Sequence, residues 1–119
     1  MSAPPVTPSA TGQPLKRYAF ILHLRPGASE AYEEAHRHVW PEMLALLKSV
    51  GISEYSIFRG DDLLILTLRA ADFDASWSQL DNHPVNLRWQ QTMAPFFAPL
   101  EGLRPGERFP MMKEVFYLP

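Results

Sequence analysis

Residues 55–68 of the chain read YSIFRGDDLLILTL, which is two bulky apolar runs on either side of a short polar stretch. Runs of this kind are typical of β-strands, and the RGDD stretch at 59–62 predicts a hairpin turn between them. Because residues 63–68 are apolar at almost every position, we expect this strand to be central in its sheet and covered on both faces. The sequence therefore predicts an antiparallel sheet built around residues 63–68.

The segments around this hairpin supply further strands and helices. The predicted elements are strands at 18–24 and 113–118 and helices at 30–50 (Ser29 as N-cap, Gly51 as stop), 72–80 (Asp72 as N-cap) and 85–97. The order β-α-β-β-α-β is typical of the ferredoxin-like α+β fold, which packs its helices on one face of the sheet. A second copy of the chain is the simplest cover for the other face, so we expect a homodimer. Pro41 predicts a kink in the first helix, because proline lacks the backbone donor.

The composition limits the function classes. The 119 residues suit one domain, with a proline-rich, disordered tail at 1–15 and the folded domain at 16–119. Eleven basic and 13 acidic residues give a net charge of −2, which argues against nucleic-acid and membrane partners. The absence of cysteine excludes disulfides and thiol chemistry. No apolar run approaches the roughly 20 residues of a membrane span, and we expect a cytoplasmic protein.

One histidine of the first helix is expected to face the interior. At about 100° per residue, His36 falls on the apolar stripe, one turn after Tyr32 and one turn before Trp40. His38 points the other way, so the two histidines do not make a metal pair. An interior histidine is either a core residue with one satisfied hydrogen bond or a proton carrier, for which an imidazole with a pKa of about 6.5 is well suited. Periodicity alone leaves both interpretations open.

A second candidate cluster lies on the last predicted helix. Trp89, Met93, Phe96 and Phe97 share one face of it, which is the pattern of a plain core. Trp89 is alternatively a stacking wall for a ligand, since sugars present apolar C–H faces that pack on indole. Tyr55, in its strand, either offers a hydroxyl to that ligand or belongs to the sheet surface. No phosphate loop, nucleophile elbow or dinucleotide motif accompanies these residues.

Three stretches together resemble the L-rhamnose mutarotase family, over residues 17–119. They are YEEAHRHVWPE at 32–42, which matches the family pattern Y-x-x-x-H-x-x-[IV]-W-P-E, YSIF at 55–58 and EVFYLP at 114–119. The resemblance implies a dimeric α+β barrel of ferredoxin-like subunits. It also implies an isomerase that interconverts the α and β anomers of a 6-deoxyhexose by acid–base ring opening, without a cofactor.

The resemblance also implies roles for individual residues. His36 matches the proposed proton donor, and the expected substrate-binding residues are Tyr32, Tyr55, Trp89, Gln90 and Trp40. Gln90 stands where the family usually has the second tryptophan of a pair. An amide can hydrogen-bond a hydroxyl that an indole would not, so both L-rhamnose and L-fucose are candidate substrates.

Other functions fit the same fold. A non-catalytic small-ligand-binding protein would bind a sugar without faster anomer exchange, and a cofactor-free oxygenase or haem-degrading protein would consume oxygen or bind haem. Fold alone does not separate these classes. The motif at residues 32–42 favours the mutarotase.

Overall fold

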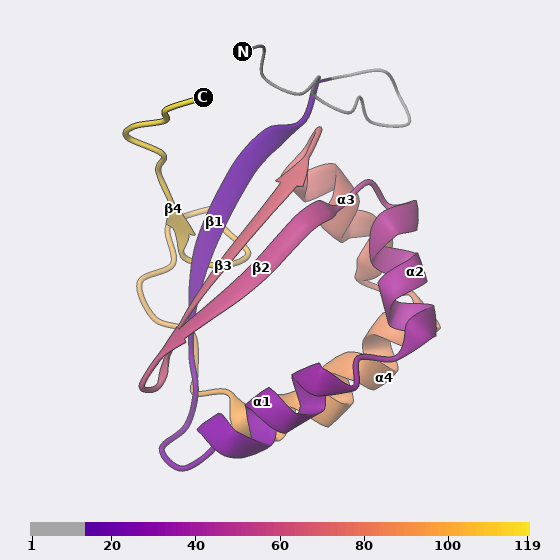
Figure 1. The fold of residues 1–119 in the computed structure, drawn as a ribbon, viewed down its shortest axis with the longest axis vertical. Helices are drawn as coiled ribbons and strands as arrows, with labels where there is room; N and C mark the ends of the chain where they lie inside the picture. Colours follow the sequence, from indigo (N-terminus) through magenta and orange to yellow (C-terminus); the bar gives the residue numbers. More distant parts are fainter. Residues whose placement is uncertain (1–13) are drawn as a thin grey trace.

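The computed structural model describes residues 14–119, and in it one four-stranded antiparallel sheet carries all its helices on one face (Figure 1). The strands are β1 (Lys16–His23), β2 (Ser53–Gly60), β3 (Leu63–Ala70) and β4 (Met111–Met112), in the order β2-β3-β1-β4. The helices are α1 (Ser29–Arg37), α2 (Pro41–Ser49), α3 (Phe73–Leu80), α4 (Pro84–Met93) and the short 3-10 helix η1 (Ala94–Phe96). This arrangement confirms the predicted ferredoxin-like fold. Most of the predicted tail, residues 1–13, lies outside the described residues.

The β3 strand is interior, as its sequence predicts. It pairs with β1 along its whole length, from Leu63 opposite His23 to Ala70 opposite Lys16, and with β2 on its other side. Its side chains alternate between the two faces of the sheet. The even-numbered residues 64–70 are buried under the helices, whereas the odd-numbered ones are half-buried on the open face. Within residues 14–119, therefore, the helices cover one face of the sheet and leave the other open.

The predicted single helix over 30–50 is wrong, because the chain forms two helices there. α1 ends at Arg37, residues 38–40 leave the helical conformation, and α2 begins at Pro41. A proline is well tolerated at the first position of a helix, since the backbone N–H that it lacks has no partner within that helix. The break therefore lies just before the proline, and Pro41 starts a helix instead of kinking one.

The predicted helix ends have mixed outcomes. Asp72 is confirmed as the N-cap of α3, since its carboxylate accepts a hydrogen bond of 3.1 Å from the backbone N–H of Ala75. Gly51 follows α2 at a φ of +86°, a conformation that glycine adopts without strain. Ser29 is not a cap, because it is already helical and Ala28 precedes it without a side-chain hydrogen bond.

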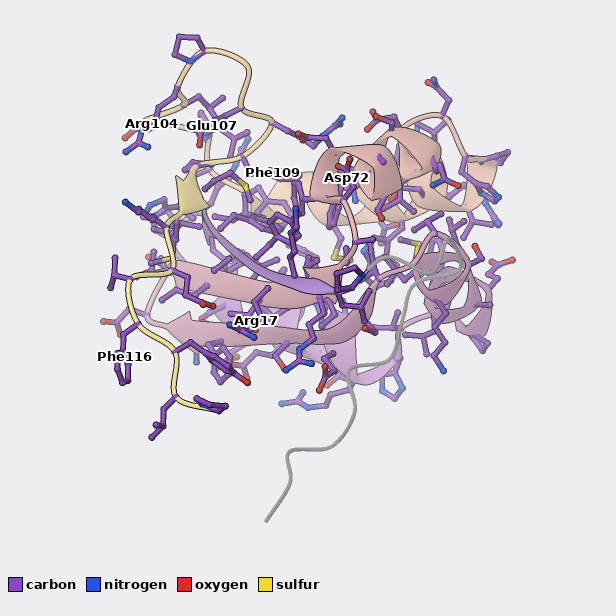
Figure 2. The ribbon with its side chains drawn as sticks, turned by 90° about the horizontal axis from the view of Figure 1, so that it is seen from above. Arg17, Asp72, Arg104, Glu107, Phe109 and Phe116 are labelled. Carbon is purple, nitrogen blue, oxygen red and sulfur yellow. The ribbon has the colours of Figure 1, made fainter. Side chains whose placement is uncertain are left out.

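The predicted strand at 113–118 is also wrong. Only Met111–Met112 pairs with β1, and the chain then leaves the sheet edge, with Phe116 79% exposed. A strand needs a neighbour with which to exchange backbone hydrogen bonds, and residues 14–119 supply none for the segment after β4. The ion pair of Arg17 with Glu114, at 2.7 Å, ties the segment to β1. Figure 2 labels Arg17 and, on the C-terminal segment, Phe116.

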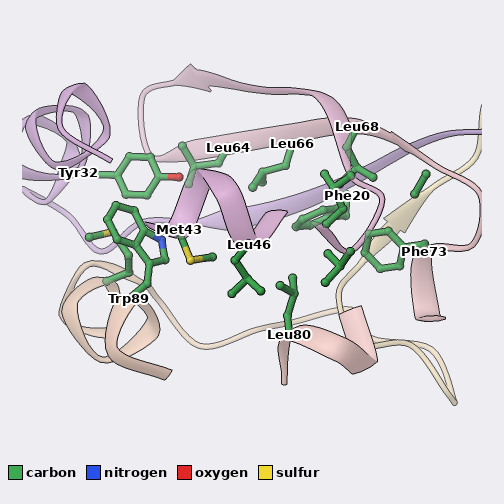
Figure 3. Packing of buried hydrophobic residues seen from close by; sticks show 14 of the residues in the cluster. Phe20, Tyr32, Met43, Leu46, Leu64, Leu66, Leu68, Phe73, Leu80 and Trp89 are labelled. Atoms are coloured by element: carbon green, nitrogen blue, oxygen red, sulfur yellow. The ribbon is translucent and has the colours of Figure 1, made fainter. Parts of the chain in front are cut away.

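The core lies between the sheet and the helices. Its buried side chains include Phe20, Met43, Leu46, Leu64, Leu66, Leu68, Phe73 and Leu80 (Figure 3). Tyr32 from α1 and Trp89 from α4 belong to the same cluster and are only 4% and 8% exposed. Two of the predicted site residues are thus held in place by the core itself.

Candidate functional site

A cavity of about 530 Å³ opens between the sheet and the helices. That volume suits a small organic ligand. Its walls include Tyr32 and His36 from α1, Tyr55 from β2, and Trp89 and Gln90 from α4. The fold thus brings together five of the six predicted site residues, although they are spread over 59 positions of the sequence (32 to 90).

The imidazole of His36 is half-buried between two aromatic rings. Its centroid lies 4.1 Å from that of Tyr32 and 5.5 Å from that of Trp89. The Nδ1 atom lies 2.8 Å from the backbone oxygen of Tyr32. Because a carbonyl only accepts hydrogen bonds, Nδ1 carries the proton in this contact, and Nε2 has the lone pair when the ring is neutral.

Burial lowers the pKa of His36 from its ordinary value, and the hydrogen bond to the backbone of Tyr32 opposes this effect in part. The charged form is disfavoured because the imidazolium loses its water. At neutral pH the ring is therefore neutral, with Nε2 as a base. This is the protonation state that a proton acceptor requires.

Two phenols accompany the imidazole in the cavity wall. Burial raises the pKa of Tyr32. The pKa of Tyr55 is also raised, first by burial and then by the nearby Tyr32. Both hydroxyls stay protonated at neutral pH, so each can donate a hydrogen bond or a proton to a ligand.

Trp89 and Trp40 form an edge-to-face pair with centroids 5.1 Å apart, but only Trp89 lines the cavity. The prediction that Trp40 binds substrate does not agree with this geometry. The reason is the helix break: Trp40 is the extended residue that precedes α2, so it does not continue the stripe of α1. It packs against Trp89 and supports it.

Gln90 lies beside Asn86 on one side of α4. Its amide donates to the Asn86 side-chain oxygen at 3.3 Å, and the Asn86 amide donates to the backbone oxygen of Leu80 at 3.0 Å. Both side chains line the cavity. A short polar strip therefore adjoins the indole of Trp89.

Part of the cavity wall is not predicted by the sequence pattern. Trp77 lines the cavity from α3, Asp81 lies just after that helix, and Arg108 and Phe109 belong to the loop before β4. Phe109 stacks on Phe20 at 4.5 Å and fastens that loop. A large aromatic side chain on a short helix is a signal that the sequence offers for Trp77, whereas no local pattern marks the loop residues.

His38 lies on the outer side of the domain, as predicted. Its side chain is 75% exposed and contacts Glu34 at 3.1 Å. Nowhere in residues 14–119 do three metal-ligating side chains gather. No helix in that part of the chain is long and apolar enough to cross a membrane, and the cytoplasmic location stays a prediction.

The chain is similar in sequence to known L-rhamnose mutarotases. A family model described as L-rhamnose mutarotase matches residues 17–118. The L-rhamnose mutarotase of Rhizobium meliloti (strain 1021) is 38% identical over 82 residues, which are 67% of this chain and 78% of that protein. The one of Burkholderia cenocepacia (strain HI2424) is 35% identical over 107 residues, which are 87% of this chain and 99% of that protein.

The chain is also similar in structure to proteins whose structures are solved. The crystal structure of an L-rhamnose mutarotase from Formosa agariphila superposes with a TM-score of 0.68 and 30% identity, over 87% of this chain and 99% of the other. Tetracenomycin F2 cyclase from Streptomyces glaucescens superposes with a TM-score of 0.56 and 21% identity. The latter likeness concerns the fold alone.

Proposed function

The chain belongs to the L-rhamnose mutarotase family, a family of carbohydrate isomerases, and from this premise we propose that it interconverts the α and β anomers of L-rhamnose. One observation carries the proposal. His36 stands in a ligand-sized cavity as a neutral base, with Nδ1 held by a backbone carbonyl and with phenols and an indole beside it.

Mutarotation opens the pyranose ring, rotates one C–C bond and closes the ring on the other face. Opening requires that one proton leave the anomeric hydroxyl and another reach the ring oxygen. In the proposed mechanism, Nε2 of His36 accepts the first proton, and the phenol of Tyr32 or Tyr55 supplies the second. Closure returns both protons. General acid–base help of this kind accelerates a reaction by about 10²–10⁴-fold.

The direction of proton transfer refines what the resemblance implies for His36. A proton donor would need the imidazolium, which burial disfavours. The imidazole therefore acts first as a base and becomes a donor only after it has taken the sugar's proton. In this proposal the indole of Trp89 packs against the apolar face of the sugar, and Gln90 binds a hydroxyl.

Saturation-transfer NMR between the two anomeric protons tests the function. We expect the protein to accelerate exchange of L-rhamnose above the rate of buffer, with L-fucose, L-mannose and D-galactose as the comparison panel. Faster anomer exchange of L-fucose than of L-rhamnose would reassign the substrate to L-fucose and would make Gln90 the candidate for the residue that selects it. Sugar binding without any faster exchange would identify a binding protein and end the proposal.

The pH dependence follows from the lowered pKa of His36. The active base is the neutral ring, so kcat/KM is expected to be flat near neutral pH and to fall as the pH drops through the pKa of the free enzyme. That midpoint should lie below the ordinary histidine value of 6.5. A fall in kcat/KM that is already half complete above pH 6.5 would contradict a buried, neutral imidazole.

We also propose that a second copy of the chain covers the open face of the sheet. Ile65 in β3 lies opposite Ile21 on one side and Phe58 on the other, so an apolar band crosses three strands. Phe58 is 61% exposed in the single chain. An exposed apolar band on a sheet is typical of an interface between subunits.

A further inference from the structure

An ion pair in the cavity wall has no role in the function proposed above. The Arg108 guanidinium donates from Nη1 to Oδ1 of Asp81 at 2.5 Å, and both side chains line the cavity. They are 30% and 40% exposed. The Nε–H of Arg108 is buried and finds no hydrogen-bond partner among residues 14–119.

Stability does not account for this pair. A partly exposed ion pair contributes little to the free energy of unfolding, whereas an unpartnered buried donor is destabilising. Asp81 also follows the C-terminus of α3, where the helix dipole disfavours a carboxylate. The loop that carries Arg108 is already fastened by the stacking of Phe109 on Phe20.

We propose, on the premise of the sugar activity above, that Arg108 and Asp81 form a subsite that binds two adjacent ring hydroxyls of the substrate. The guanidinium of Arg108, which keeps unused N–H donors beside the ion pair, donates to one hydroxyl oxygen, and the Asp81 carboxylate accepts from the neighbouring hydroxyl. This places a donor and an acceptor side by side, which is the pattern that a vicinal diol complements.

The charges of the pair decide the substrate class. The guanidinium and the carboxylate compensate one another, so the subsite favours a neutral hexose over a sugar acid or a sugar phosphate. A sugar that lacks one of the two hydroxyls leaves a hydrogen-bonding group of the subsite without its partner, and sites that hydrogen-bond a substrate hydroxyl discriminate against such analogues. Arg108 and Asp81 are thus specificity-determining residues, whereas the proton transfers stay with His36.

Direct binding tests the subsite independently of catalysis. Trp77 and Trp89 line the cavity, so their fluorescence should report binding of L-rhamnose and of analogues that lack the hydroxyl at C2, C3 or C4. Arg108→Leu is expected to weaken L-rhamnose binding by about 10- to 100-fold. The analogue without the contacted hydroxyl should lose affinity for the wild type but much less for the variant.

Three further variants separate recognition from folding. Arg108→Lys keeps a cation for Asp81 but removes the guanidinium with its unused N–H donors, and it should show the same loss of affinity with an unchanged melting temperature. Asp81→Asn should weaken binding of L-rhamnose and reduce the difference in affinity between L-rhamnose and the deoxy analogue. Arg104→Leu, an exposed position on the same loop outside the cavity, is the matched control and should bind like the wild type.

The outcomes distinguish this proposal from the mutarotase proposal. Two results would show that the pair only fastens the loop, even if the protein accelerates anomer exchange. One is an affinity of Arg108→Lys for L-rhamnose equal to that of the wild type. The other is a loss of affinity for the deoxy analogue that is as large in Arg108→Leu as in the wild type. Sugar binding without exchange would remove the catalytic proposal and leave the subsite standing if the variant pattern holds. A wild type that binds none of these sugars overturns both.

Discussion

Replacement of His36 by alanine is expected to remove most of the acceleration of L-rhamnose anomer exchange, by about 10²–10⁴-fold. The half-buried ring lines the cavity, and the hydrogen bond of Nδ1 to the Tyr32 carbonyl leaves the lone pair on Nε2. Alanine offers no group that could take the anomeric proton. Saturation-transfer NMR at neutral pH, over a range of enzyme concentrations, measures the loss.

His38→Ala is the matched control, because it removes an imidazole only two positions away. That side chain lies outside the cavity and contacts Glu34 at the surface, so its variant should exchange anomers at the wild-type rate. A circular dichroism spectrum and a melting curve establish that both variants fold. Wild-type exchange in folded His36→Ala would remove this imidazole from the mechanism.

The inward orientation of His36 could be predicted from the sequence because α1 is a regular helix through both Tyr32 and His36. The same periodicity failed for Trp40, since the helix breaks at residues 38–40. For Trp89 the sequence pattern does not decide between a core residue and a residue that stacks on a ligand. The structure shows that it is buried in the core cluster and also lines the cavity, so its core position is compatible with the proposed contact to a sugar.

The remaining part of the cavity wall depends on contacts that no local pattern encodes. Arg108 meets Asp81 across 27 positions of sequence, and the stacking partner of Phe109 is Phe20 in the first strand. The prediction of a strand at 113–118 is wrong for a related reason. The composition of this segment suits a strand, but whether it becomes one depends on a hydrogen-bonding neighbour, and the described part of the chain places none beside it.

Ile65→Glu is expected to turn a dimer into a monomer. Ile65 stands at the centre of the apolar band, with Ile21 and Phe58 directly opposite on the neighbouring strands. In a dimer whose sheets face each other, a carboxylate there would be buried without a partner, which is costly, whereas in the monomer it stays in water. Sedimentation velocity at several concentrations measures the change.

The matched control for this substitution is Leu44→Glu. It adds the same carboxylate at an exposed apolar position, but on α2, which lies on the helical side of the domain. It should sediment as the wild type does. The helices cover only the even-numbered side chains of β3, so Ile65→Glu leaves the core untouched and the monomer should stay folded. A wild type that is monomeric at high concentration, or an Ile65→Glu variant that still dimerises, would show that the apolar band is not the interface.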